Sequence, residues 1–142
     1  DLAQLFEHYF EFKNALATDD ILKAKSMAAD MLKSLSKLDQ ASFEEKAHMD
    51  WSKYHAVLSG LLEKVNSHGS LADVRETFLT ISDKMISIAE TFNVYTHSLY
   101  VQRCPMADAN KGANWLSRSD EVLNPYFGEA MLACGEVIKR IR

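Results

Sequence analysis

Four successive windows of apolar residues, spaced three and four apart, dominate the first two-thirds of the chain. They run from Leu2 to Leu16, from Ile21 to Leu38, from Phe43 to Val65 and from Leu71 to Phe92. This spacing is the period of an amphipathic helix. No proline interrupts residues 1–104, and long helices require that. The pattern therefore predicts four helices.

Capping signals separate these windows. Thr18 or Asp19 is placed to cap the second helix, Ser42 with Glu45 forms a capping box for the third, and Ser70 with Asp73 resembles one for the fourth. Short connections force neighbouring helices to be antiparallel. We expect one all-α domain over residues 1–142. In it, residues 1–93 form an up-down-up-down antiparallel four-helix bundle and residues 94–142 cap one end.

The segment 104–135 has a different composition. It holds both cysteines, both prolines and three of the five glycines. The stretch from Tyr95 to Met106 is rich in aromatic and β-branched residues and is predicted to be extended. Residues 107–112 read as a turn, and Asn124-Pro125 opens a short helix with Asn124 as its N-cap. We expect an irregular last third made of a short extended segment, a loop and a short helix.

Sulfur atoms bracket this segment. Cys104 and Met106 point the same way in an extended strand, and Met131 and Cys134 share a face of a helix. Thiolates and thioethers are the ligands that copper(I) selects. The pattern predicts a soft-metal site for copper(I) or silver(I), built from Cys104, Met106, Met131, Cys134 and an imidazole from His97. Two other interpretations stay open: a Cys104–Cys134 disulfide, or free thiols that pack as small hydrophobic groups.

Charge and motifs exclude several classes of function. The net charge is −4 and no basic stripe is present, so nucleic acid is not expected as a partner. No apolar run approaches the roughly 18 residues of a membrane span. No nucleophile with a base and no paired acids can be placed, so we expect no enzyme. The chain begins at Asp1, which leaves room for an export signal or anchor removed upstream.

A string of residues in the last third is specific enough to compare with known families. It comprises Cys104-Pro105-Met106-Ala107-Asp108, Asn110-Lys111-Gly112-Ala113, Trp115-Leu116-Ser117, Asn124-Pro125-Tyr126-Phe127-Gly128 and Met131-Leu132-x-Cys134-Gly135. The first helix adds Tyr9, Phe10, Lys13, Asn14, Ala15 and Leu16. Together they resemble a bacterial domain of unassigned biochemical function. That domain occurs alone in exported proteins and at the C-terminal end of periplasmic adaptor subunits of copper/silver and other heavy-metal efflux pumps.

The resemblance implies a periplasmic or otherwise exported location, with a lipid anchor as one option. It also implies a role in heavy-metal handling, with efflux-pump adaptor or outer-membrane components as partners. It does not identify metal ligands. Two functions follow from the sequence: a periplasmic module that binds copper(I) or silver(I), and a disulfide-stapled structural or interaction domain without metal. In the second, Trp115, Tyr126 and Phe127 either anchor a partner or cover the bundle as core.

Overall fold

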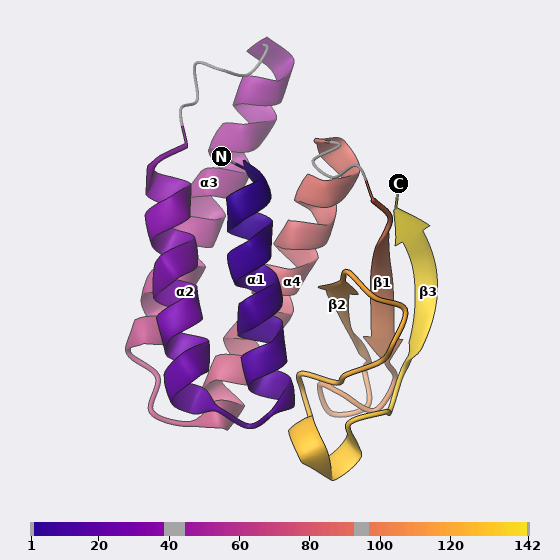
Figure 1. Ribbon diagram of the computed structural model, residues 1–142. Coiled ribbons are helices and arrows are strands. Elements are labelled where there is room, and N and C mark those ends of the chain that lie inside the picture. Colours follow the sequence, from indigo (N-terminus) through magenta and orange to yellow (C-terminus); the bar gives the residue numbers. More distant parts are fainter. Residues whose placement is uncertain (1, 39–44, 93–96, 142) are drawn as a thin grey trace.

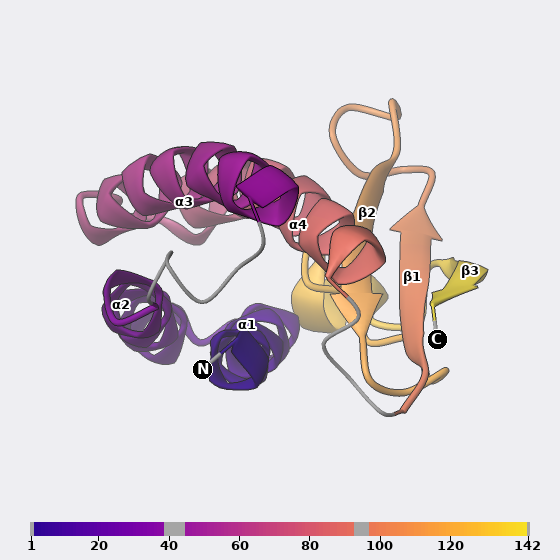
Figure 2. The same ribbon diagram turned by 90° about the horizontal axis from the view of Figure 1, so that it is seen from above.

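Four helices occupy the first two-thirds of the chain. The computed structural model describes residues 2–38, 45–92 and 97–141, except for the side chains of residues 45–49. The helices are α1 (Leu2–Ala17), α2 (Ile21–Ser36), α3 (Glu45–Asn66) and α4 (Leu71–Thr91). Successive helices are antiparallel (Figure 1). Seen from above, α1 and α2 form one layer and α3 and α4 a second (Figure 2). The four predicted helices are confirmed.

Two of the predicted caps can be checked. Ser70 accepts a hydrogen bond from the backbone N–H of Asp73 over 3.2 Å and begins α4 as predicted. At α2 the cap is Asp20, which accepts from the N–H of Lys23 over 3.0 Å, so the prediction of Thr18 or Asp19 was wrong. Asp19 instead adopts a left-handed backbone with φ 58°. The capping box predicted at Ser42 lies outside the described residues.

The last third forms a sheet, which overturns the all-α prediction. Its strands are β1 (Leu99–Cys104), β2 (Ala113–Ser117) and β3 (Glu136–Ile141), antiparallel in the order β2-β1-β3. β2 contacts α4 and α1, and the sheet runs along the side of the bundle instead of capping one end (Figures 1 and 2). The fold is therefore α+β.

The extended segment predicted from Tyr95 to Met106 contains β1, whereas β2 and β3 escaped prediction because burial does not alternate along them. In β2, four residues are buried: Ala113, Trp115, Leu116 and Ser117. A strand covered on both faces loses the period of two that identifies a half-exposed strand. In β3 the first five residues are all exposed, so burial does not alternate there either. The short helix expected after Asn124 is a single 3₁₀ turn, η2 (Gly128–Met131), preceded and followed by turns.

A row of aromatic rings joins the two parts of the fold. Tyr9 of α1 stacks on Phe78 of α4 with ring centres 5.4 Å apart. Phe78 packs against Tyr126, and Tyr126 packs edge-on against Trp115 of β2. Trp115 is fully buried, while Tyr126 and Phe127 are partly buried against the same core. These aromatic residues belong to the core between helices and sheet.

The hydroxyl of Tyr9 fixes the position of the sheet along the helix axes of the bundle. It accepts the backbone N–H of Leu116 in β2 over 3.0 Å and shares a hydrogen bond with Ser82 of α4 over 2.8 Å. Tyr9 and Ser82 are fully buried. Because buried polar groups need hydrogen-bond partners, each of these groups is satisfied by the others.

Replacing Tyr9 with phenylalanine is expected to lower the free energy of unfolding by about 1–3 kcal/mol, because the buried N–H of Leu116 loses its acceptor. Urea denaturation measures the change. Tyr54→Phe is the matched control, since the Tyr54 hydroxyl makes no hydrogen bond in the described part of the chain. Equal stability of the two variants would show that the Tyr9 hydroxyl does not hold the sheet in place.

Candidate functional site

The two cysteines lie together although thirty residues separate them. Cys104 ends β1 and is fully buried, and Cys134, between η2 and β3, is half-buried. Their sulfur atoms are 3.3 Å apart, and both are free thiols. The prediction that they come close is confirmed. We call Cys104 and Cys134 the thiol pair.

Asn124 holds the Cys134 side of the pair. This fully buried residue accepts the backbone N–H groups of Tyr126 and Phe127 through Oδ1, over 2.8 and 3.1 Å. Its Nδ2 donates to the carbonyl oxygen of Cys134 over 2.7 Å. The prediction that Asn124 is the N-cap of a helix was wrong, because η2 begins at Gly128, after Phe127, without a side-chain cap. Asn124 instead caps the turn before η2 and ties the two ends of the segment 124–134 together.

Gly135 allows the chain to come close to β1 directly after Cys134. Its φ is 141°, a backbone conformation that L residues rarely adopt. A Cβ atom there would lie 3.0 Å from the carbonyl oxygen of Arg103 and 3.0 Å from the ring of Trp115. Glycine therefore lets residue 134 lie against the end of β1, where Cys104 is.

A salt bridge anchors the same segment to the helices. Arg75 of α4 donates to the carbonyl oxygens of Leu16 and Pro125, over 2.7 and 2.8 Å, and pairs with Asp19 over 2.7 Å. Asp19 in turn accepts the backbone N–H of Glu129 over 3.1 Å. The hydrogen bond from Arg75, followed by that from Glu129, lowers the pKa of the Asp19 carboxyl. Arg75 was not predicted to have a role and Asp19 was predicted only as a helix cap, because nothing in the apolar pattern marks two distant polar residues as partners.

On the face of β1 that carries Cys104, Gln102 links the sheet to the segment after β2 by hydrogen bonds. Its Oε1 accepts from the indole N–H of Trp115 over 2.8 Å, and its Nε2 donates to the carbonyl oxygens of Ser119 and Glu121. Gln102 is fully buried and lies two residues before Cys104, hence on the same face of β1. The thiol pair therefore lies beside a fully hydrogen-bonded polar core.

Comparison with known proteins identifies the helical part. Residues 5–97 match the model of a family described as "Protein of unknown function (DUF3347)". The chain belongs to the DUF3347 family. The match ends at His97, before the segment that carries the thiol pair, and it does not refer to efflux adaptors. No curated protein and no solved structure matches the chain at a significant level.

Met131 and His97 of this DUF3347 chain were also predicted to be metal ligands, and they lie at different positions relative to the thiol pair. Met131 is half-buried and ends η2, and the backbone N–H of Cys134 donates to its carbonyl oxygen over 3.1 Å. Since η2 is one 3₁₀ turn, Met131 and Cys134 do not share an α-helical face. His97 is exposed and precedes β1, whereas Cys104 ends it. At roughly 3.3 Å per residue the two are about 20 Å apart, so the structure does not bring His97 to the thiol pair.

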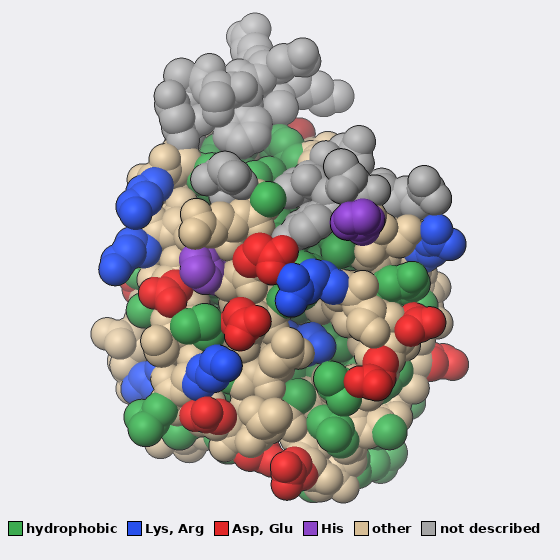
Figure 3. Space-filling view, in the orientation of Figure 1, with side chains coloured by type: hydrophobic (Ala, Val, Ile, Leu, Met, Phe, Trp, Pro, Cys, Tyr) green, Lys and Arg blue, Asp and Glu red, His purple; other side chains and the backbone are tan. Residues whose placement is uncertain are grey.

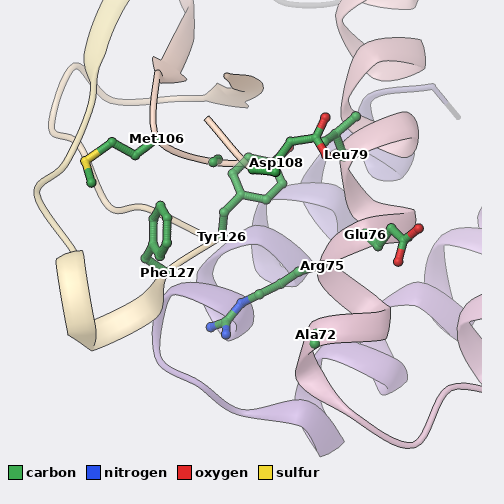
Figure 4. Close-up of a pocket in the computed structure, with 10 residues that line it drawn as sticks. Ala72, Arg75, Glu76, Leu79, Met106, Asp108, Tyr126 and Phe127 are labelled. Carbon is green, nitrogen blue, oxygen red and sulfur yellow. The ribbon is translucent and has the colours of Figure 1, made fainter. Parts of the chain in front are cut away.

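Met106 lies in the turn that follows β1 and lines a cavity. The prediction that Cys104 and Met106 share an extended strand was wrong, because β1 ends at Cys104. This cavity, of about 530 Å³, lies between α4 and the residues that follow β1. In Figure 4 the Met106 side chain points away from Tyr126 and Asp108 and passes above Phe127. Met106 is 47% exposed, so its thioether is accessible to a ligand and is not filling the core.

The described residues contain no cluster of three or more His, Cys, Asp or Glu side chains around a possible ion position. These residues are 2–38, 45–92 and 97–141. Within the same residues, no helix is long and apolar enough to cross a membrane. Acidic and basic side chains are interspersed on the face in Figure 3. The thiol pair is thus the candidate site on which the geometry converges.

The two thiols differ in exposure, and Cys104 affects the ionisation of Cys134. The hydrogen-bonding contact with Cys104 raises the pKa of the Cys134 thiol above its ordinary value, and desolvation adds to the increase. Since only the thiolate reacts with alkylating agents, Cys134 reacts slowly near neutral pH for as long as Cys104 is beside it.

Replacing Cys104 with alanine is expected to speed alkylation of Cys134 at pH 8, because the contact that raises its pKa is gone. The rate of iodoacetamide labelling, measured from pH 6 to 10, gives the result. The midpoint of the profile should move to lower pH. A faster rate with an unchanged midpoint would mean that only access has improved, and the pairing of the two thiols would then have no effect on ionisation.

Asn124→Asp keeps the oxygen that accepts from Tyr126 and Phe127. It replaces Nδ2, which donates to the carbonyl oxygen of Cys134 over 2.7 Å, by a second oxygen that cannot donate. We expect a loss of about 1–3 kcal/mol in unfolding free energy, as for a buried acceptor without a donor. Asn114→Asp is the control. The Asn114 side chain accepts a hydrogen bond from Arg103 through Oδ1, and an aspartate keeps this acceptor. If both variants unfold at the same urea concentration, the tether to Cys134 contributes nothing.

Proposed function

We propose that this domain is a periplasmic module that binds a soft monovalent ion, copper(I) or silver(I), through Cys104 and Cys134 and takes part in heavy-metal efflux. The observation that carries the proposal is the 3.3 Å separation of two free thiols. Thiolate is the protein ligand that these ions prefer. The resemblance of the surrounding motif to domains of efflux adaptors supports the link to efflux and the exported location.

The separation of the sulfur atoms suits a two-coordinate ion after a small shift. With metal–thiolate bonds of about 2.3 Å, two sulfurs on opposite sides of an ion lie about 4.6 Å apart. The observed 3.3 Å is about 1.3 Å short of that value and about 1.3 Å longer than a disulfide bond. Cys134 is half-buried at the surface, so a movement on its side of the pair reaches either state.

Exposure favours entry of an ion from the Cys134 side. Cys104, the last residue of β1, is buried and Cys134 is half-buried, so an ion meets Cys134 first and Cys104 second. Met106 follows Cys104 by two residues, in the turn after β1, and is 47% exposed, so we take its thioether as the third ligand in this proposal. Both thiols must lose protons when they bind an ion, so binding weakens as the pH falls.

The test is a competition titration of the reduced protein against a copper(I) chelator. Wild type is expected to take copper(I) in preference to zinc, and the Cys104→Ser/Cys134→Ser double variant to lose binding, because thiolates supply the charge. Met106→Leu is expected to weaken binding with unchanged helical content, since leucine and methionine have similar volumes. Met131→Leu is its matched control and is expected to have the smaller effect.

Failure of the reduced wild type to compete with the chelator would refute metal binding. The second candidate, a disulfide-stapled structural domain, would then stand, since the same 3.3 Å separation places the thiols for oxidation. In that case oxidised protein should resist urea better than the Cys104→Ser/Cys134→Ser variant, by about 3–4 kcal/mol for a loop of roughly thirty residues.

A further inference from the structure

A second, smaller cavity lies between α1 and the residues that follow β2. Its volume is about 140 Å³, and its walls include Phe10, Lys13 and Asn14 of α1 with Ser117, Arg118 and Glu121. None of the residues that line it belongs to the proposed metal site. This volume has room for several water molecules or one small organic molecule.

Lys13 is the unusual residue in this cavity. It is only 4% exposed, and in the described part of the chain its ammonium group makes no hydrogen bond or ion pair. Burial and, to a smaller extent, the positive charge of Arg118 together lower the pKa of Lys13 to about 8, although Glu121 opposes the shift. At pH 7 the side chain is still mostly charged. The Glu121 carboxylate lines the same cavity and raises the pKa of Lys13 from a distance, but the described residues show no ion pair between the two. A largely buried cation without a direct partner is costly, so an anion in the cavity would relieve this cost.

Asn14 supplies a second unmatched group. Its Oδ1 atom is buried and has no hydrogen-bond partner among the described residues. A buried acceptor without a donor costs as much as a lost hydrogen bond. Whatever fills the cavity therefore needs a donor as well as a negative charge. A bare carboxylate provides only the charge.

The remaining walls define the ligand further. The Oγ atoms of Ser117 and Ser119 accept backbone N–H groups, so their hydroxyl protons are free to donate to an anion. Arg118 is held at the rim by Glu7, over 2.6 Å, and by the ring of Phe10. Phe10 and Leu123 add apolar surface, and the nearby carboxylate of Glu121 disfavours more than one negative charge.

We propose that this cavity binds a small α-hydroxycarboxylate. Its carboxylate lies between Lys13 and Arg118, its hydroxyl donates to Asn14 Oδ1, and a short apolar group packs against Phe10 and Leu123. The site is independent of the thiol pair, because the two share no residue.

Lactate is the probe that tests this, added to the full chain at pH 7 and followed by ¹H–¹⁵N chemical shifts. Saturable shifts are expected at residues 10–14 and 117–123. Acetate, which has the carboxylate but no hydroxyl, should bind about five- to tenfold more weakly, the effect of one hydrogen bond. The Cys104→Ser/Cys134→Ser variant should bind lactate as wild type does.

Lys13→Met, which keeps the length and removes the charge, is expected to abolish binding, and Lys33→Met on the exposed face of α2 to leave it unchanged. Arg118→Gln, at an exposed position, should weaken binding even if Lys13→Met does not fold. Absence of saturable shifts in wild type, or equal binding by Arg118→Gln, overturns the proposal. Equal affinity for acetate and lactate overturns the role of Asn14.

Discussion

The hydrogen bond between the Tyr9 hydroxyl and the backbone N–H of Leu116 is the contact on which the rest of the structure depends. It joins the first helix to the central part of β2, and Ser82 of α4 completes the junction. Burial raises the pKa of Tyr9 far above its ordinary value, so the hydroxyl stays protonated at physiological pH. The Tyr9 ring also stacks on Phe78. One side chain therefore takes part both in the packing between α1 and α4 and in the hydrogen bond that positions the sheet on them.

The position of the thiol pair depends on several tertiary contacts of this kind. Cys104 is the last residue of β1, and its position is set by the packing of the sheet against the helices. Three further interactions bring Cys134 close to Cys104. Arg75 with Asp19 holds the turn before η2, Asn124 ties that turn to Cys134, and Gly135 lets the backbone approach β1. Two thiols thirty residues apart are therefore held in contact by the fold, without a covalent bond between them.

The helices, the extended segment that contains β1 and the closeness of the cysteines were predictable, whereas β2, β3 and the pairing of the three strands into a sheet were not. The apolar period marks α1 to α4 because each buries one face. β2 is buried on both faces, so Trp115 and Leu116 give no alternation. Arg75, Asp19 and Lys13 resemble surface charges in the sequence, and their roles arise from tertiary contacts. His97 was grouped with the sulfur residues by sequence proximity, but an extended strand separates it from Cys104.

The effective concentration of one thiol of the pair for the other tests most directly whether the fold holds them together. It is obtained from the fraction of Cys104–Cys134 disulfide at equilibrium in glutathione buffers of known composition. A pair held by the docked sheet should give a value far above the millimolar range of short flexible linkers. A millimolar value would mean that the fold does not hold the thiols as a pair, and would contradict the account.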